Sequence, residues 1–243
     1  MAKISGGTDI YLIPGDPITN VRAPRMFNRV FERCGLDAVM LPVQVRERDF
    51  AVWLKATFLA RNVKGVIIAP PHKPQVVHLL DSCGLVARVA RSVNIVRRTS
   101  EGQLEGDLFD GEGILGALDW FNIPYRGKRV LILGAGVSAA AIGVSLAQGG
   151  TTQGAEFIAF YDPVPGKAIG LATELDGFFD ANVVAVDSSD PAGYDLVVNA
   201  SAVGLGKDDP LPCDVGRMEP HAALFDIYAQ VVRVIASEHD EVL

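Results

Sequence analysis

The chain has 243 residues, a length that suits one large or two small domains with a buried core. Hydrophobic residues make up 49% and charged residues 21%, an ordinary composition for a globular protein. The 22 basic and 29 acidic residues give a formal charge of −7, and no basic block interrupts that balance, so a nucleic-acid partner is excluded.

Three scattered cysteines, Cys34, Cys83 and Cys213, form no CxxC pair and lie beside no histidine cluster. They therefore predict no disulfide framework and no metal site, and we expect each to be a small core residue in a reducing cytosol. The first residues contain no apolar run typical of a signal peptide, and no stretch of 18 apolar residues occurs. The expectation is a cytoplasmic protein with no membrane partner.

The first half of the chain predicts alternating strands and helices. Pro24 suits the first turn of a helix, and Gly35 would end that helix after a run of apolar residues at helical spacing. Apolar runs predict strands at 9–13, 38–43, 65–69, 92–96 and 103–107, and helical periodicity predicts helices at 24–34, 46–59 and 112–121. This alternation predicts a separate N-terminal α/β layer.

A glycine-rich turn follows the apolar strand predicted at 128–133. Gly134 would allow the tight turn, Gly136 would let the backbone approach a pyrophosphate, and Ala139 would keep helix and strand close. Amide groups at the start of the helix would face the phosphates. The predicted cofactor-binding residues here are Gly134, Ala135, Gly136, Val137, Ser138 and Ala139. A βαβ unit without a nucleotide is the alternative, because any strand-to-helix turn favours glycine.

A second strand, predicted at 155–161, ends at Asp162, where a βαβ unit places an acid. Its carboxylate would accept hydrogen bonds from the adenosine ribose hydroxyls and repel the 2′-phosphate of NADP, so NAD is the preferred cofactor and NADP a possible one. A helix at 166–175, strands at 182–186, 194–200 and 222–228 and a helix-like tail at 231–239 complete this half. Together they predict a C-terminal Rossmann-type domain.

The order of landmarks resembles the shikimate/quinate dehydrogenase family over nearly the whole chain. The matching pieces are Pro17-Ile18 with Pro24 and Asn28, Gly35-Leu36-Asp37, Gly65 to Pro71-His72-Lys73, Val93-Asn94, Gly106 to Asp110-Gly111, the glycine turn, Asp195 to Ala200, and Phe225-Asp226-Ile227-Tyr228. The resemblance implies a substrate domain at 1–109, an NAD(P)-binding domain at 110–228 and the active site in the cleft between them. It also implies a tail, 229–243, that packs back on the first domain, in a monomer or homodimer.

The resemblance places Lys73 and Asp110 on the family's catalytic lysine and aspartate. Moving a hydride from a carbinol carbon to nicotinamide requires removing the hydroxyl proton. Burial helps a lysine to release its proton, whereas a neighbouring carboxylate holds and orients the ammonium. Without the resemblance, the two residues would be interpreted as a surface lysine and a helix N-cap.

The substrate-binding positions carried over from the family are Val21, Ala23, Ala69, Asn94 and Tyr228, and the nucleotide side adds Asn199 and Ala200. Val21 and Ala23 replace two serines that hold the substrate carboxylate, and Ala69 replaces a threonine. Likewise Ile67, Ile95 and Leu108 replace polar residues. Since an unpaired buried polar group costs ~1–3 kcal/mol, such a pocket would bind shikimate poorly. Arg22 or His72 would be a replacement anion contact, unless they are a solvated arginine and a turn histidine.

The resemblance therefore implies an NAD(P)-dependent oxidoreductase of shikimate metabolism. It would interconvert a secondary alcohol and a ketone on a small cyclic hydroxy acid of the shikimate or quinate type, or on a less polar analogue. Two other hypotheses are a catalytically idle NAD-binding sensor, favoured by the missing substrate contacts, and an enzyme similar to methylenetetrahydrofolate dehydrogenase, which shares the two-domain plan.

Overall fold

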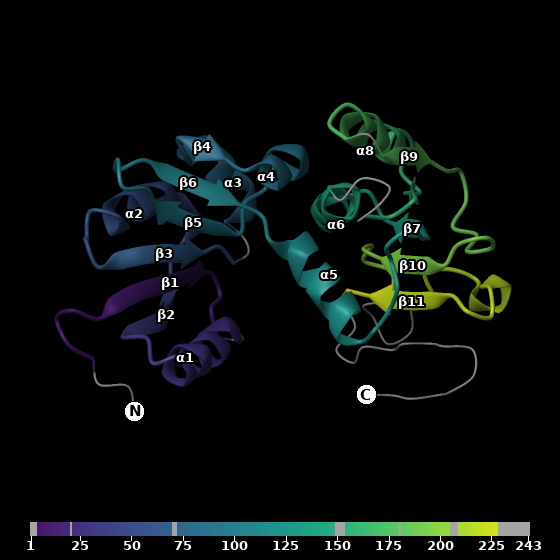
Figure 1. Ribbon diagram of the computed structural model, residues 1–243. Helices are drawn as coiled ribbons and strands as arrows, with labels where there is room; N and C mark the ends of the chain where they lie inside the picture. The colour runs from purple at the N-terminus through teal and green to yellow at the C-terminus, as the bar shows by residue number, and fades with distance from the viewer. Residues whose placement is uncertain are drawn as a thin grey trace. The chain divides into compact units, whose positions relative to one another are not determined.

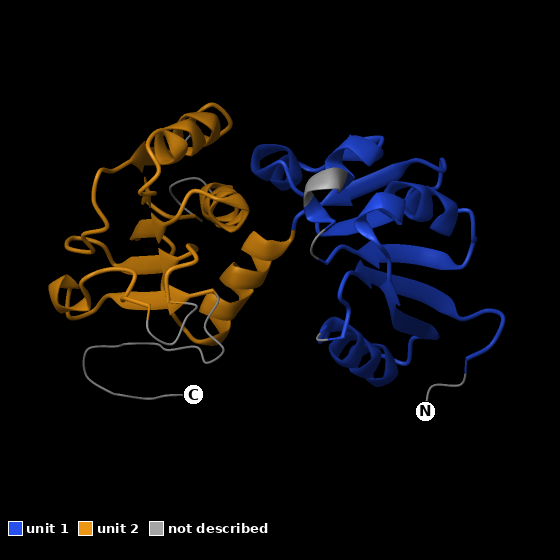
Figure 2. Ribbon diagram, turned by 180° about the vertical axis from the view of Figure 1, so that it is seen from behind, with its two compact units in different colours: residues 1–108 blue, residues 109–243 orange. Residues whose placement is uncertain are grey.

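The computed structural model describes residues 4–19, 21–69, 72–148, 154–179, 181–204 and 209–227. The chain divides into two compact units, residues 1–108 and 109–243, which are coloured separately in Figure 2. Each unit is a layer of β-sheet with helices packed against it, so both are α/β units (Figure 1).

Unit 1 contains a mixed six-stranded sheet in the order β2-β1-β3-β5-β6-β4. β1 runs parallel to β2 and β3, whereas β5 is antiparallel to both of its neighbours. The strands are β1 (Asp9–Gly15), β2 (Ala38–Gln44), β3 (Val63–Ile67), β4 (Ser82–Cys83), β5 (Ile95–Arg98) and β6 (Leu104–Asp107), and the helices are α1 (Ala23–Arg33), α2 (Phe50–Thr57), α3 (Lys73–Val76) and α4 (Leu85–Ala90).

Most of the predicted elements of this unit are present, with shifted ends. The helix predicted at 46–59 is shorter, because a 3₁₀ turn at Glu47–Asp49 precedes α2. Its aromatic stripe is core as expected, since Phe50 and Phe58 are buried. The strand predicted at 65–69 ends at Ile67, and the short helices α3 and α4 follow no periodicity long enough to predict them.

Unit 2 contains a five-stranded sheet that is parallel throughout, in the order β11-β10-β7-β8-β9. The central strand, β7, has β8 on one side and β10 on the other, so the strand order reverses there, as in Rossmann-type folds. The strands are β7 (Arg129–Leu133), β8 (Phe157–Tyr161), β9 (Asn182–Ala185), β10 (Leu196–Asn199) and β11 (Ala223–Asp226), and the helices are α5 (Asp110–Trp120), α6 (Val137–Ala147) and α8 (Lys167–Asp176).

Small residues let the helices of unit 2 approach one another and the sheet. A Cβ on Gly111 of α5 would overlap the carbonyl oxygen of Ala141 and the hydroxyl of Ser145 in α6. Similarly, a Cβ on Gly143 would overlap the ring of Phe160 in β8. The first turn of α5 is therefore held against the helix that begins at the glycine-rich turn (Figure 1).

The cysteines do not all behave as predicted. Cys213 is buried in unit 2 and fits the expectation of a small core residue, but Cys34 is exposed, so the prediction was wrong for it. It directly follows the last residue of α1, where the chain turns at the surface. Among the described residues, no helix is long and apolar enough to cross a membrane, and no three metal-ligating side chains gather.

The α5–α6 contact predicts a stability difference between two glycines of one helix. Gly111→Ala must push α5 away from α6 and should lower the free energy of unfolding by ~1–3 kcal/mol. Gly116→Ala is the control, because its Cβ meets nothing within 4 Å; it should raise stability by ~0.5–1 kcal/mol. Denaturant unfolding of the two variants measures both changes. Equal effects would show that the helix contact does not depend on Gly111.

Candidate active site

The turn between β7 and α6 is built around Gly134, which has a φ of +105°. Its amide donates a 2.7 Å hydrogen bond to the carbonyl of Tyr161 at the end of β8. A Cβ at this position would lie 3.0 Å from the carbonyl oxygen of Ala200, which follows β10. Only glycine tolerates both the positive φ and the close approach to Ala200. The ends of β7, β8 and β10 therefore meet at this turn, where the strand order reverses.

At Gly136, by contrast, neither the backbone conformation nor the packing requires a glycine. Its φ of −93° suits any residue, and a Cβ there would meet nothing within 4 Å. Gly136 and Val137 are exposed, Ser138 is half-buried, and Ala139 is fully buried against the unit. Among the described residues no side chain caps the 11-residue α6, so the amides of its first turn lack a side-chain partner and suit an anionic group.

Asp162 closes this loop from the end of β8. One carboxylate oxygen accepts a 2.9 Å hydrogen bond from the amide of Ala135, and the other accepts a 2.9 Å bond from the amide of Val164. Each oxygen keeps a second lone pair, which leaves capacity for a ribose hydroxyl. Asp162 therefore fixes the glycine-rich loop and places a negative charge beside it.

Asn199 organises the opposite side of the same turn. It is fully buried, and its amide nitrogen donates 2.9 Å bonds to the carbonyl of Val203 and to the carboxylate of Asp226. Its amide oxygen accepts from the amide and the hydroxyl of Ser201, at 3.1 and 2.7 Å. The side chain is thereby occupied within the protein, and it holds the loop that carries Ala200 against Gly134.

In unit 1, four hydrogen bonds continue the sheet beyond the carboxyl ends of its parallel strands. They join neighbouring segments in order: the amide of Val45 to the carbonyl of Gly15 (3.2 Å), Ala69 to Pro14 (3.3 Å), Ile68 to Asn94 (2.7 Å) and Asn94 to Asp107 (3.0 Å). These residues form what we call the carboxyl edge of unit 1. Ligands of open α/β sheets bind at such edges.

Lys73 and Asp110 each begin a helix. The amide of His72 donates a 3.2 Å bond to the carbonyl of Ala69, and this turn places Lys73 at the first position of α3, directly after the carboxyl edge. Asp110 is the first residue of α5 in unit 2, after the cap residue Phe109, so the N-cap interpretation of Asp110 was wrong. Both side chains are half-buried.

His72 is not the exposed turn histidine that was one expectation. Its ring is fully buried and stacked on Phe50, with centroids 4.3 Å apart and planes 6° from parallel. Neither ring nitrogen makes a hydrogen bond of normal geometry with the described residues. Burial lowers the pKa of His72, although the nearby carbonyl of Val45 and the carboxylates of Glu47 and Asp16 act in the opposite direction. His72 is therefore a neutral packing residue next to Lys73.

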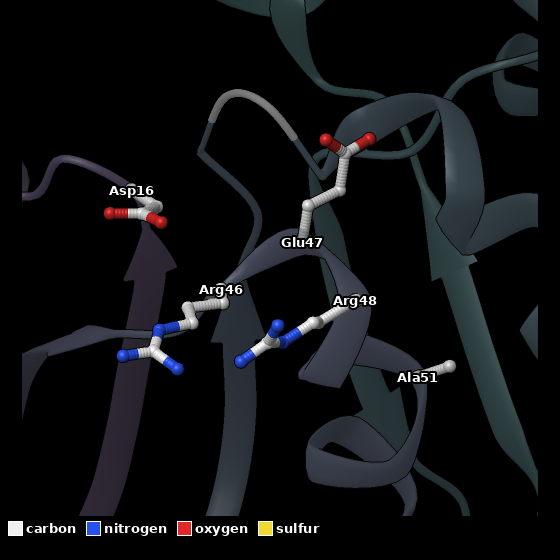
Figure 3. Close-up of a pocket in the computed structure, with 5 residues that line it drawn as sticks. All are labelled: Asp16, Arg46, Glu47, Arg48 and Ala51. Carbon is white, nitrogen blue, oxygen red and sulfur yellow. The ribbon is translucent and has the colours of Figure 1, made fainter.

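An open pocket of mixed charge lies beyond the ends of β1 and β2, as Figure 3 shows. Glu47 points away from the side to which the guanidinium groups of Arg46 and Arg48 extend. Asp16 accepts a 2.8 Å hydrogen bond from the side chain of Gln44. The residues that line the pocket are Asp16, Arg46, Glu47, Arg48 and Ala51, so its two cations and two anions give no net charge.

Three of the predicted substrate positions lie around one core cluster of unit 1. Val21 and Ala23, at the start of α1, and Ala69, after β3, are half-buried and pack against one core cluster of Ile13, Phe31 and Met40. Asn94 lies at the carboxyl edge. Tyr228 and the tail 229–243 lie outside the described residues.

Comparisons with known proteins agree with this architecture. Residues 13–96 match the family model described as the shikimate dehydrogenase substrate binding domain. A shikimate dehydrogenase (NADP(+)) of Geobacter metallireducens is 33% identical over 239 residues, which cover 93% of this chain and 80% of that protein. Its counterpart in Rubrobacter xylanophilus is 29% identical and covers 92% and 78%.

Solved structures show the same likeness. The ligand-free 5-ketofructose reductase of Gluconobacter sp. is 28% identical, with a TM-score of 0.79 over 91% of this chain and 79% of that one. The shikimate 5-dehydrogenase of Thermus thermophilus, in complex with NADP(H) and shikimate, is 26% identical, with a TM-score of 0.78 over 92% and 80%. The two-domain α/β fold and the relatedness of the sequences lead to one conclusion: the chain belongs to the shikimate dehydrogenase family.

Proposed function

We propose that the chain is an NAD(P)-dependent oxidoreductase that interconverts a secondary alcohol and a ketone on a small cyclic substrate of the shikimate or quinate type, or a less polar analogue. The observation that carries the proposal is the glycine-rich turn at the strand reversal of unit 2, in a chain related to shikimate dehydrogenases. Two neighbours of known structure are named for reactions of this kind, on shikimate and on 5-ketofructose.

The nucleotide would lie on the loop between β7 and α6. The first amides of α6 would bind the pyrophosphate, Gly136 would leave room for it, and Ala200 would border the site from β10. When bound, the nicotinamide ring accepts or donates the hydride. The chain's own contribution is to hold the nucleotide and to exclude water from the reacting carbon.

The proton would be moved by Lys73, with Asp110 as the carboxylate that orients it. A lysine at the start of α3 is fixed by the turn from Ala69, and Asp110 is fixed by the contact between α5 and α6. In oxidation of the alcohol Lys73, as the neutral amine, would accept the hydroxyl proton, and in reduction of the ketone it would return that proton to the carbonyl oxygen. Rigid attachment of both residues suits such a step.

NAD is the proposed preferred cofactor, although the related dehydrogenases are named for NADP(+). The 2′-phosphate of NADP would lie near the end of β8, where Asp162 carries a negative charge. The four residues that follow, Pro163 to Gly166, include no lysine or arginine. The next cation along the chain is Lys167, the first residue of α8, so the proposed preference rests on the negative charge of Asp162, which lies beside the loop and would repel a phosphate.

Replacing Lys73 tests the reaction. Lys73→Ala should lower kcat with shikimate or quinate by ~10²–10⁴-fold and leave nucleotide affinity unchanged, because general acid–base catalysis contributes that much. The rate of nicotinamide reduction, read from its absorbance, measures the change. The control is Lys64→Ala, which removes an exposed ion pair with Asp9 at the amino end of β3. Nucleotide binding without turnover in the unmodified protein, on any cyclic alcohol, would instead support a sensor.

The two loop glycines should separate folding from nucleotide binding. Gly136→Ala should weaken NAD binding by about tenfold or more with little change in unfolding free energy, since its Cβ meets only open space. In contrast, Gly134→Ala should lower stability by ~1–3 kcal/mol, because of its positive φ and its contact with Ala200. Calorimetric titration measures the NAD affinity of the two variants, and thermal unfolding measures their stability. Unchanged NAD affinity in Gly136→Ala would place the nucleotide elsewhere.

Cofactor choice tests Asp162. Asp162→Asn should raise the ratio of NADP to NAD affinity by about tenfold, because it removes the charge, while its single side-chain oxygen can still accept from the amide of Ala135 or from that of Val164. Asp176→Asn, at the exposed last residue of α8, is the matched control and should leave the ratio unchanged. The proposed preference is wrong if the unmodified protein binds NADP as tightly as NAD at the same ionic strength.

A further inference from the structure

We infer that unit 1 recognises an uncharged part of the substrate through an apolar ledge beside Lys73, formed by Val21, Ala23, Ile67 and Ala69. This inference rests on the proposed function and adds the class of substrate: a ring or chain that presents hydrocarbon or ester groups to the ledge, and no carboxylate.

The four side chains of the ledge cover one core cluster. Ile67 and Ala69 alternate along the end of β3, whereas Ile68 between them is buried on the other side of the sheet. Ala23 is the first residue of α1, and Val21 directly precedes the N-cap residue Arg22. All four pack on the Ile13, Phe31 and Met40 cluster and remain half-exposed, so they form the surface of that core at the carboxyl edge.

The ledge is joined to the proposed reaction residues through the backbone. The carbonyl of Ala69 accepts the amide of His72, the residue that precedes Lys73, and the amide of Ile68 bonds to the carbonyl of Asn94. One strand end therefore carries the apolar surface, the lysine and the polar Asn94. A substrate whose hydroxyl reaches Lys73 would bring its neighbouring groups close to the ledge.

None of the four side chains has a hydrogen-bond donor, so a carboxylate placed on them would lose water without replacement. Among the described residues, the nearby arginines do not form a buried binding site for a carboxylate. Arg46 and Arg48 share their pocket with Asp16 and Glu47. Arg22 is exposed at the N-cap of α1 and, with Arg25 and Arg29, lines a groove along the helix that Val21 of the ledge also borders, so Arg22 is included in the test.

The test compares shikimate with its methyl ester, which keeps the ring and the hydroxyl groups and removes the charge. With NAD or NADP, whichever binds, kcat/KM for the ester should exceed that for shikimate by about tenfold or more, with Lys73→Ala as the blank. Both compounds are also titrated onto the protein saturated with reduced nucleotide. Binding then reports on the ledge even where turnover fails.

Two sets of variants follow. Val21→Ser with Ala23→Ser adds two hydroxyl donors and should move the preference toward shikimate by about tenfold, whereas Arg22→Ala should leave the preference unchanged. Val21→Thr, which keeps the volume of the side chain, serves if the double variant does not fold. Far-UV circular dichroism and nucleotide affinity confirm that each variant is intact.

The outcomes separate the two proposals. Lys73-dependent turnover with equal or greater preference for shikimate, or loss of shikimate binding in Arg22→Ala, overturns the ledge and leaves the oxidoreductase intact. Absence of turnover with both compounds counts against the oxidoreductase. In that case, tighter binding of the ester still supports the ledge, and equal or tighter binding of shikimate overturns it.

Discussion

The contact between Gly134 and the segment after β10 is the constraint on which unit 2 depends. The backbone of the glycine-rich turn passes so close to Ala200 that no side chain fits, and the amide of Gly134 is bonded to the end of β8 at the same time. Three parallel strands thus end against one turn. Asp162 and Asn199, from the two neighbouring strands, then hold the loops on either side.

This arrangement leaves the first amides of α6 outside the internal hydrogen-bond network. The loop is rigid because its polar groups are bonded to protein, yet the end of the helix faces outward with no side-chain cap. A preformed site of this kind loses little entropy when an anion binds. The same helix, α6, packs closely against α5 at Gly111. The helix that would hold the nucleotide therefore also fixes Asp110, the residue before Gly111.

In unit 1, the proposed proton-transfer residue Lys73 and the proposed apolar recognition surface both lie near the end of β3. Lys73 is placed by a turn that starts at Ala69, and His72 anchors that turn through its stacking on Phe50. The side chains of the apolar ledge offer a substrate no hydrogen-bond donor or acceptor. A polar side chain there would need a partner once a substrate covered it, whereas Val, Ala and Ile need none. Substrate choice can therefore change while the backbone that positions the lysine stays the same.

The sequence by itself determined most of the strands, the longer helices and the glycine turn, because periodicity and turn chemistry are local properties of the chain. It missed β4, α3 and α4, which are too short to show a period, and it was the family resemblance that singled out Lys73 and Asp110. It misjudged what depends on distant neighbours. His72 was expected at the surface or as an anion contact, but Phe50 buries it, and Cys34 was expected in the core but lies on the surface. Only the tertiary structure decided that Gly111 is a helix contact, that Asn199 uses its amide within the protein and that four apolar residues from α1 and β3 share one surface. These properties arise from packing between segments far apart in the chain, and no local pattern encodes such packing.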